Sequence, residues 1–221
     1  MLVLHHAPDN ASLVVRIALL ATNEPFRTVP VDRPGGLDTA QFRALNPAGR
    51  IPALETPDGP MFETGAILLW LADRHPGAGL APPAGHPDRG RFLSWLFFLS
   101  NTPHADLRHL FYPDRHAPPE GQAGHRALTI ARMRAHFRLL DDAARDRPAL
   151  FALPSALTLY VCTLLRWSVL YPEAQQPWCD PGAFPALHAL ARALDIHPAG
   201  AEAARHDGLG PTPFSAPVAA P

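Results

Sequence analysis

The spacing of apolar residues in the first third of the chain predicts short strands that alternate with helices. Residues 1–5 form an apolar run and residues 26–31 alternate around β-branched positions, so both are expected to be strands. Between them, after Ser12, apolar residues recur at helical spacing until a stop at Asn23 and Pro25. A strand, a helix and a strand of this length suit a right-handed parallel crossover.

The following segment predicts a hairpin between two further helices. A helix is expected over residues 39–45, and two very short strands are expected over residues 53–56 and 61–62. The turn Pro57-Asp58-Gly59-Pro60 joins these strands into an antiparallel hairpin. A helix over residues 63–74 places its apolar residues on one face. The predicted order is therefore βαβαββα, a mixed α/β domain.

The pattern changes beyond residue 76, where no further strand is expected. Residues 77–87 are dense in Pro and Gly and form a predicted linker. Helices are expected after it, over residues 88–111, 120–145, 155–170 and 184–194. The chain is therefore divided into an α/β domain (1–76), the linker (77–87), an all-helical C-terminal domain (88–197) and a Pro/Ala-rich tail (198–221) that is either disordered or draped on the surface.

Composition and charge exclude several classes of partner. With 221 residues, of which 47% are hydrophobic, the chain can bury an ordinary globular core. Its formal net charge is -1, so no basic excess is available for nucleic acid or an anionic membrane surface. Neither a secretory signal nor a CxxC motif is present, so a cytoplasmic protein without dithiol chemistry is expected. The 12 histidines show no metal-binding spacing, and no metal is assigned.

The segment NPAGRIPALETPDGPMFETGAILLWLADRHP, residues 46–76, strongly resembles the glutathione-binding segment of the glutathione transferase family. The family pattern is N-P-x-G-x-[VI]-P-x-L, then two hairpin strands, then E-S or E-T at the start of a helix, and each element is present. The predicted linker and helices match the rest of the family, so the resemblance covers about the whole chain. It implies a thioredoxin-like domain followed by an all-helical domain, glutathione as co-substrate, a role in detoxification and a homodimer.

The resemblance implies a glutathione site built from two places in the first domain. Pro52 stands at the family's cis-proline, which turns the backbone of Ile51 outward to pair with the cysteinyl unit of glutathione. Glu63 and Thr64 stand at the first turn of a helix, where free N–H groups favour the γ-glutamyl carboxylate. Thr64 is also explained as an ordinary helix cap. Arg50 is expected to reach the glycyl carboxylate, or else to be an unpaired surface arginine.

A third contribution is implied from the helical domain. The segment SNTPHADLRHLFYPD, residues 100–114, is similar to the segment of the bacterial beta class whose His lines the site near the glutathione sulfur. His104 falls at that position, and Ala105 stands where that class has Lys. The resemblance therefore places His104 in the glutathione site, with one donor fewer beside it. The alternative is that His104 is an exposed polar residue on a helix.

The catalytic position must lower the pKa of the glutathione thiol, because the thiolate is the nucleophile. The segment HHAPDNASLVVRIAL resembles the beta-class N-terminal segment Y-x-P-G-A-C-S-L-x-x-x-I-x-L, with Ala11 in place of its Cys and Ser12 retained. Ser12 is the first candidate for a catalytic donor to the sulfur and Asn10 is the second, although Ser12 is also explained as a helix N-cap. Asp9 would oppose a thiolate and is expected to be a turn residue.

The sequence thus predicts an enzyme, a glutathione transferase that conjugates reduced glutathione to a hydrophobic electrophile. The electrophile pocket is expected between the N-terminal loop and the first two C-terminal helices, with Trp95, Leu99, Phe111 and Tyr112, which are equally explained as core residues. Two alternatives stay open. One is a non-catalytic glutathione- or ligand-binding protein of the same fold, and the other is a glutathione-dependent isomerase or dehalogenase.

Overall fold

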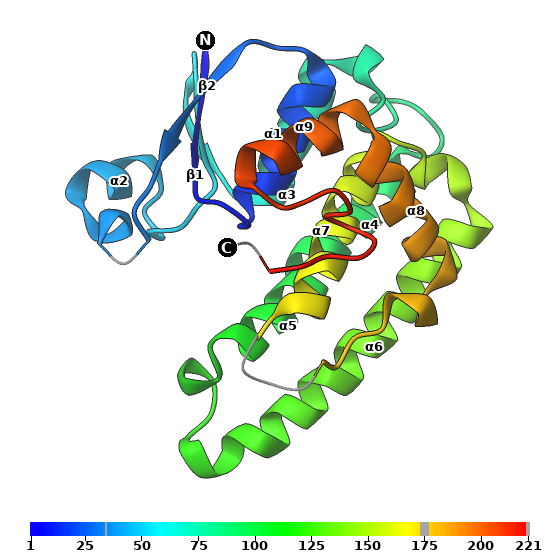
Figure 1. Cartoon of the computed structure of the whole chain (residues 1–221). Coiled ribbons are helices and arrows are strands. Elements are labelled where there is room, and N and C mark those ends of the chain that lie inside the picture. The colour runs from blue at the N-terminus through cyan, green and yellow to red at the C-terminus, as the bar shows by residue number, and fades with distance from the viewer. Residues whose placement is uncertain (34, 173–176, 220–221) are drawn as a thin grey trace.

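The computed structural model describes residues 1–33, 35–172 and 177–219, and it divides into a sheet part and a helical part (Figure 1). Four strands form one sheet in the order β2-β1-β3-β4. The parallel pair β1 and β2 requires a crossover, which helix α1 (Ser12–Thr22) supplies; β3 pairs antiparallel with both β1 and β4. The strands are β1 (Leu2–His6), β2 (Phe26–Pro30), β3 (Ala53–Thr56) and β4 (Gly59–Phe62).

Different helices cover the two faces of the sheet. Leu54 of β3 packs with apolar residues of α1 and α3 (Thr64–Arg74) in the main core. Ala53, which points the opposite way, joins Phe42 of α2 (Ala40–Leu45) in a smaller cluster. Figure 1 shows α1 and α3 between the sheet and the helical part, with α2 on the other face. The predicted order βαβαββα is therefore confirmed.

The hairpin between β3 and β4 differs in one boundary from the predicted one. Strand β4 begins at Gly59, so Gly59 and Pro60 belong to the strand rather than to the turn. The pairing of Thr56 with Gly59 leaves only Pro57 and Asp58 at the tip. Gly59 has φ 117°, a conformation that side-chain-bearing residues rarely adopt, which explains why glycine stands there.

The helical part begins with two helices where the sequence predicts one over residues 88–111. Pro103 occupies the first turn of the second helix, and Thr102 before it has the non-helical angles φ -120° and ψ -81°. Because proline has no N–H and restricts the residue before it, the first helix ends there. The helices of this part up to the C-terminal segment are α4 (Arg89–Asn101), α5 (Pro103–Phe111), α6 (Gln122–Asp146), α7 (Ala156–Leu170) and α8 (Pro185–Ile196).

The C-terminal segment corrects a second expectation, that of a disordered or draped tail over residues 198–221. Helix α9 (Pro198–Asp207) lies against α1 (Figure 1), with Ala203 and Ala204 buried. Gly200 permits a close approach, because a Cβ atom there would lie 2.2 Å from the carbonyl oxygen of Leu194. Small residues thus serve here as a packing surface, which their Ala- and Gly-rich composition alone does not distinguish from a disordered tail.

A buried ion pair ties the loop after β1 to the helical part. The side chain of Arg166 in α7 is fully buried, and its Nε and Nη2 donate to the two carboxylate oxygens of Asp9 at 2.9 and 2.8 Å. Trp167 Nε1 and Tyr171 Oη also donate to this carboxylate, each at 2.9 Å. Burial alone raises the pKa of Asp9, but these hydrogen bonds and the Arg166 charge hold it below its usual range. Asp9 is in a turn as expected, with φ 45°, and it also anchors that turn.

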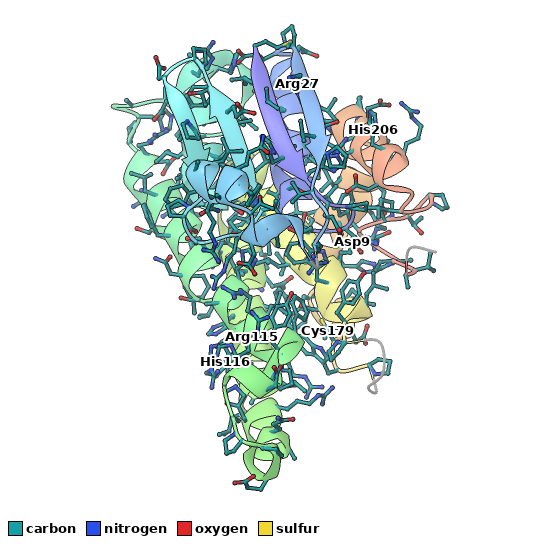
Figure 2. The ribbon with its side chains drawn as sticks, turned by 90° about the vertical axis from the view of Figure 1, so that its left-hand side faces the viewer. Asp9, Arg27, Arg115, His116, Cys179 and His206 are labelled. Atoms are coloured by element: carbon teal, nitrogen blue, oxygen red, sulfur yellow. The ribbon has the colours of Figure 1, made fainter. Side chains whose placement is uncertain are left out.

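The same ion pair reaches the C-terminal segment. Arg166 Nη1 donates to the carbonyl oxygen of Pro213 at 2.7 Å, and the backbone N–H of Asp9 donates to Asp207 at the end of α9 at 3.2 Å. Figure 2 shows Asp9 where the sheet part meets the helical part. Three segments that are distant in sequence are therefore held at one buried point.

Two kinds of structure are absent from the described residues. None of their helices has both the length and the apolar character needed to cross a membrane. No group of three or more His, Cys, Asp or Glu side chains among them is arranged to hold a metal ion.

We predict that Asp9→Asn lowers the free energy of unfolding by about 3 kcal/mol or more, because it leaves the Arg166 guanidinium buried without its counter-charge. Chemical denaturation at neutral pH measures this loss. The matched control is Asp73→Asn, which removes a half-exposed ion pair with Arg89 and should cost less than about 1 kcal/mol. Equal losses in the two variants would contradict the anchoring role of Asp9.

Candidate functional site

The segment before β3 presents an open stretch of backbone. The Ile51–Pro52 peptide bond is cis, as the resemblance implies. The Ile51 side chain is buried against Phe42 in the smaller cluster, whereas its backbone N–H and C=O have no hydrogen-bond partner among the described residues. Asn46 fixes the preceding loop, because its Nδ2 donates to the carbonyl oxygen of Arg50 at 2.6 Å. A ligand with an extended backbone can pair with Ile51 here.

Helix α3 begins beside this stretch without a side-chain cap. Glu63 precedes the helix with φ 70°, a conformation that is strained for a residue with a side chain, and its side chain is exposed. Thr64, the first residue of the helix, is buried. The N–H groups of the first turn have no intrahelical partner, so they and the helix dipole favour an anion at this end.

A chain of polar contacts leads from Thr64 into the helical part. Thr64 lies close enough to the buried Tyr160 of α7 to lower its pKa, and the Tyr160 hydroxyl lies 2.6 Å from Nδ1 of His104 in α5. Burial raises the pKa of Tyr160, so the phenol stays protonated. Burial, followed by the Arg108 charge, lowers the pKa of His104 to about 4. The imidazole is therefore neutral at neutral pH.

The two candidates for the catalytic donor differ in the state of their side chains. Ser12 is buried, its hydroxyl donates to the carbonyl oxygen of Ala7 at 3.1 Å, and it accepts from the Ala7 N–H at 3.4 Å. It is not the cap of α1, because that position is Ala11. The Oδ1 atom of Asn10 is buried and has no hydrogen-bond partner among the described residues. Asn10 thus has free hydrogen-bonding capacity that Ser12 lacks.

Arg108 is a residue of the site that the sequence did not identify. It lies in α5, half-buried, and burial lowers the pKa of its guanidinium, as do the nearby charges of Arg50 and Arg115, while Glu63 and Tyr112 raise it. Arg108 is therefore within electrostatic range of two residues predicted to bind glutathione. An arginine at helical spacing carries no signal of its own, because it equally suits a solvated face.

The structure brings the predicted residues together in two groups. Arg50 and Glu63 lie around Arg108, and Thr64 and His104 both contact Tyr160. The loop that carries Asn10 and Ser12 reaches the second group through Trp167, which bonds Asp9 and packs on the His104 ring at 5.7 Å between centroids.

The four residues that the sequence predicts around an electrophile differ in how deeply they are buried and in what they contact. Leu99 is fully buried in the main core and cannot line a pocket. Trp95 packs edge-on against Phe98 and the core, and Phe111 packs edge-on against Tyr171. Tyr112 is only half-buried and is the one of the four that contacts charged side chains, through Arg33 and Arg115.

The chain is similar to known proteins over most of its length. Residues 4–79 match the family model described as the glutathione S-transferase N-terminal domain. The chain is 28% identical over 172 residues to glutathione S-transferase GstA of Escherichia coli O157:H7, which covers 75% of this chain and 81% of that protein. It is 33% identical to a sphingomonad glutathione S-transferase solved in complex with glutathione, with a TM-score of 0.79 over 94% of this chain and 100% of that one. Over 103 residues it is 35% identical to maleylacetoacetate isomerase of Rhizobium meliloti (strain 1021), covering 45% of this chain and 47% of that protein.

We predict that the burial of neutral His104 makes the protein less stable as the pH falls. The pKa of His104 is lowered from 6.5 to about 4 on folding, so its contribution is fully present above pH 6.5 and is lost as the pH falls towards 4. One such proton changes the free energy of unfolding by about 1.4 kcal/mol per pH unit between these values.

Chemical denaturation at several pH values between 7 and 4.5 measures this slope in the wild type and in His104→Gln, whose side chain does not titrate. The slope should be smaller in the variant. His86→Gln, which changes an exposed histidine, is the control and should leave the slope unchanged. Superimposable slopes for the wild type and His104→Gln would show that His104 titrates in the folded protein as it does in the unfolded chain.

Proposed function

Because this chain belongs to the glutathione S-transferase family, we propose that it binds reduced glutathione and joins it through its sulfur to an electrophile. The observation that carries the proposal is the open backbone of Ile51 beside the uncapped first turn of α3. The two features offer strand-like pairing and an anion-binding helix end, which are the two things that an extended anionic tripeptide needs.

The glutathione carboxylates are assigned to separate places. The γ-glutamyl carboxylate lies at the start of α3, where it accepts from the Thr64 hydroxyl and from N–H groups of the first turn. The strained conformation of Glu63 supports this assignment, because it turns the chain so that the helix begins without a side-chain cap. The glycyl carboxylate lies at Arg50, which is exposed and has no ion-pair partner among the described residues. Pro52 holds the turn that presents Ile51.

The thiolate lies at the loop before α1, with Asn10 as its donor. The single hydroxyl proton of Ser12 is already donated to Ala7, so a bond from Ser12 to the sulfur would require that contact to break. The Oδ1 atom of Asn10 has no partner in the described chain, and the amide nitrogen on the same side chain is the group that would donate to the sulfur. Ser12 therefore holds the loop in shape, and Asn10 stabilises the charge. His104, uncharged, lies on the helical side of this site and supplies shape and a neutral polar group rather than a positive charge.

The reaction that follows is nucleophilic attack by the thiolate. The sulfur forms a bond to an electrophilic carbon, and a leaving group departs with its bonding electrons while the thiol proton passes to solvent. Trp95 in α4, Phe111 at the end of α5 and Tyr112 after it are half-buried, and they are the side chains available to contact the electrophile. A cytoplasmic homodimer that acts in detoxification is proposed from the family resemblance, with the exposed Phe97 of α4 available to a second copy.

A glutathione-dependent isomerase is the second candidate, because 103 residues of the chain are similar to a maleylacetoacetate isomerase. A protein that binds glutathione without turnover is the third. Retention on immobilised glutathione followed by a conjugation assay with a generic aromatic electrophile separates them. All three are retained, and only the transferase forms the conjugate.

We predict that Glu63→Ala combined with Thr64→Ala abolishes glutathione binding while the fold is kept, because the γ-glutamyl carboxylate loses its hydroxyl donor and the shape of its turn. Isothermal titration calorimetry gives the dissociation constant, and circular dichroism checks the fold. Glu120→Ala, at the start of α6, is the control and should bind glutathione normally. Affinity within a factor of about three of the wild type, under 1 kcal/mol, would place the γ-glutamyl group elsewhere.

We also predict that Asn10→Ala raises the pKa of bound glutathione and lowers turnover at neutral pH. A charge-assisted hydrogen bond of about 1.5 to 3 kcal/mol corresponds to roughly a tenfold or larger change in the thiolate population. Ultraviolet titration of the bound thiolate measures this pKa. Ser12→Ala should cost about 1 kcal/mol of stability through its lost Ala7 contacts and leave the thiol pKa unchanged. A raised thiol pKa in Ser12→Ala alone would reverse the two roles.

A further inference from the structure

Cationic side chains from both parts of the molecule gather around Tyr112, at the end of α5. Arg33, in the segment after β2, donates from Nη2 to the Tyr112 hydroxyl at 3.1 Å. The guanidinium of Arg115 lies over the Tyr112 ring, 4.6 Å from its centroid. Arg108 lies one helical turn before Tyr112 and is within electrostatic range of Arg115 and Arg50. We call Arg33, Arg108 and Arg115 the arginine cluster.

The arginine cluster has no ion-pair partner in the described part of the chain, although the Glu63 carboxylate is within electrostatic range of Arg108. No carboxylate there lies within ion-pair distance of any of the three guanidinium groups, whereas arginines elsewhere, such as Arg74 and Arg132, pair with carboxylates. Like charges brought this close repel one another, most of all where burial reduces the screening by water, as at the half-buried Arg108. An arrangement of this kind is relieved by an anion.

Glutathione itself does not account for all of these charges. In the proposed function, its γ-glutamyl carboxylate is held at the start of α3 and its glycyl carboxylate at Arg50. Both are contributed by the sheet part. Arg108 and Arg115 belong instead to α5 and the segment after it, on the helical side that faces the electrophile. Neither carboxylate is assigned to a residue of the arginine cluster, so its guanidinium groups stay without a directly paired anion after glutathione has been placed.

We propose that the electrophile of this enzyme carries an anionic group, a carboxylate or sulfonate, that binds the arginine cluster with Arg108 as its main contact. This inference rests on the proposed function and replaces its uncharged hydrophobic electrophile with an amphipathic one. The aromatic face of Tyr112 contacts the apolar body of the molecule, and the guanidinium groups pair with its charged end. Arg33 contributes from the sheet side, so the charged end is held between the two parts.

Binding of two matched glutathione conjugates tests the proposal without requiring turnover. S-(4-carboxybenzyl)glutathione and S-(4-carbamoylbenzyl)glutathione have nearly the same shape and differ in one charge. Calorimetric dissociation constants for both conjugates and for glutathione alone are compared in the wild type. The carboxylate conjugate should bind about tenfold tighter than the carboxamide. This preference should shrink at high ionic strength, because the cluster is partly exposed.

Variants identify the residues responsible. Arg108→Gln should reduce the preference for the carboxylate conjugate over the carboxamide conjugate to about twofold or less, a ratio that does not depend on any change in the affinity for glutathione alone. Arg115→Gln, at an exposed position that does not endanger folding, should reduce the preference by a smaller factor. Arg27→Gln is the matched control, since Arg27 is an exposed arginine at the end of the sheet farthest from Arg115 in Figure 2.

The outcomes separate this proposal from the one on which it depends. Equal affinity of the wild type for the two conjugates, with normal binding of glutathione, would overturn the anionic electrophile and leave the transferase intact. If Arg108→Gln weakens glutathione and both conjugates by the same factor, Arg108 serves glutathione and the proposal is wrong. If glutathione does not bind to the wild type at all, the proposed function fails first.

Discussion

The ion pair between Asp9 and Arg166 is the contact on which the geometry of the site depends. A buried arginine needs a partner for its charge, and in this fold that partner is supplied by the turn between β1 and α1. Since the same turn carries Asn10 and precedes Ser12, pairing Asp9 with α7 also fixes where these side chains lie. Trp167 links the turn to His104, because it donates to Asp9 and packs on the imidazole. The position of the catalytic loop is thus set by a charge buried in the other part of the molecule.

A second connection joins the two parts at the start of α3. Thr64 belongs to the sheet part and lies near Tyr160 of the helical part, which is hydrogen-bonded to His104. Burial keeps Tyr160 and His104 uncharged, since it raises the pKa of Tyr160 and lowers that of His104. A neutral network can be buried beside an anion-binding helix end without adding a charge to it. The polarity of the site therefore comes from backbone N–H groups and from arginines.

Charge is distributed unevenly in a chain whose net charge is only -1. Most carboxylates that pair with arginine do so away from the site, as Asp106 does with Arg132 and Glu24 with Arg74. The arginine cluster around Tyr112 is left uncompensated among the described residues. Net charge correctly argues against a long polyanionic partner, because such a partner requires a large basic surface. It says nothing of a small anion that occupies one cluster.

The sequence by itself determined the secondary-structure elements and the family, because both depend on patterns of residues that are close together in the chain. Apolar spacing predicted the order βαβαββα and the helices beyond it, and residues 46–76 carry a motif specific enough to identify a glutathione transferase. The errors fall where a local pattern is ambiguous: Pro103 splits one predicted helix, and the Ala-rich α9 packs on α1 instead of forming a tail.

Only the tertiary structure decided which side chains meet. Arg166 is the one arginine in the apolar helix α7, which indicates that it has a buried partner. However, 157 positions separate Arg166 from Asp9, and no spacing rule spans that distance. The same holds for the convergence of Arg33 and Arg115 on Tyr112, and for the hydroxyl of Ser12 that bonds Ala7 rather than standing free. The energy of a polar side chain depends on the groups that folding brings around it, whereas periodicity records only which face it shares with its neighbours in the chain.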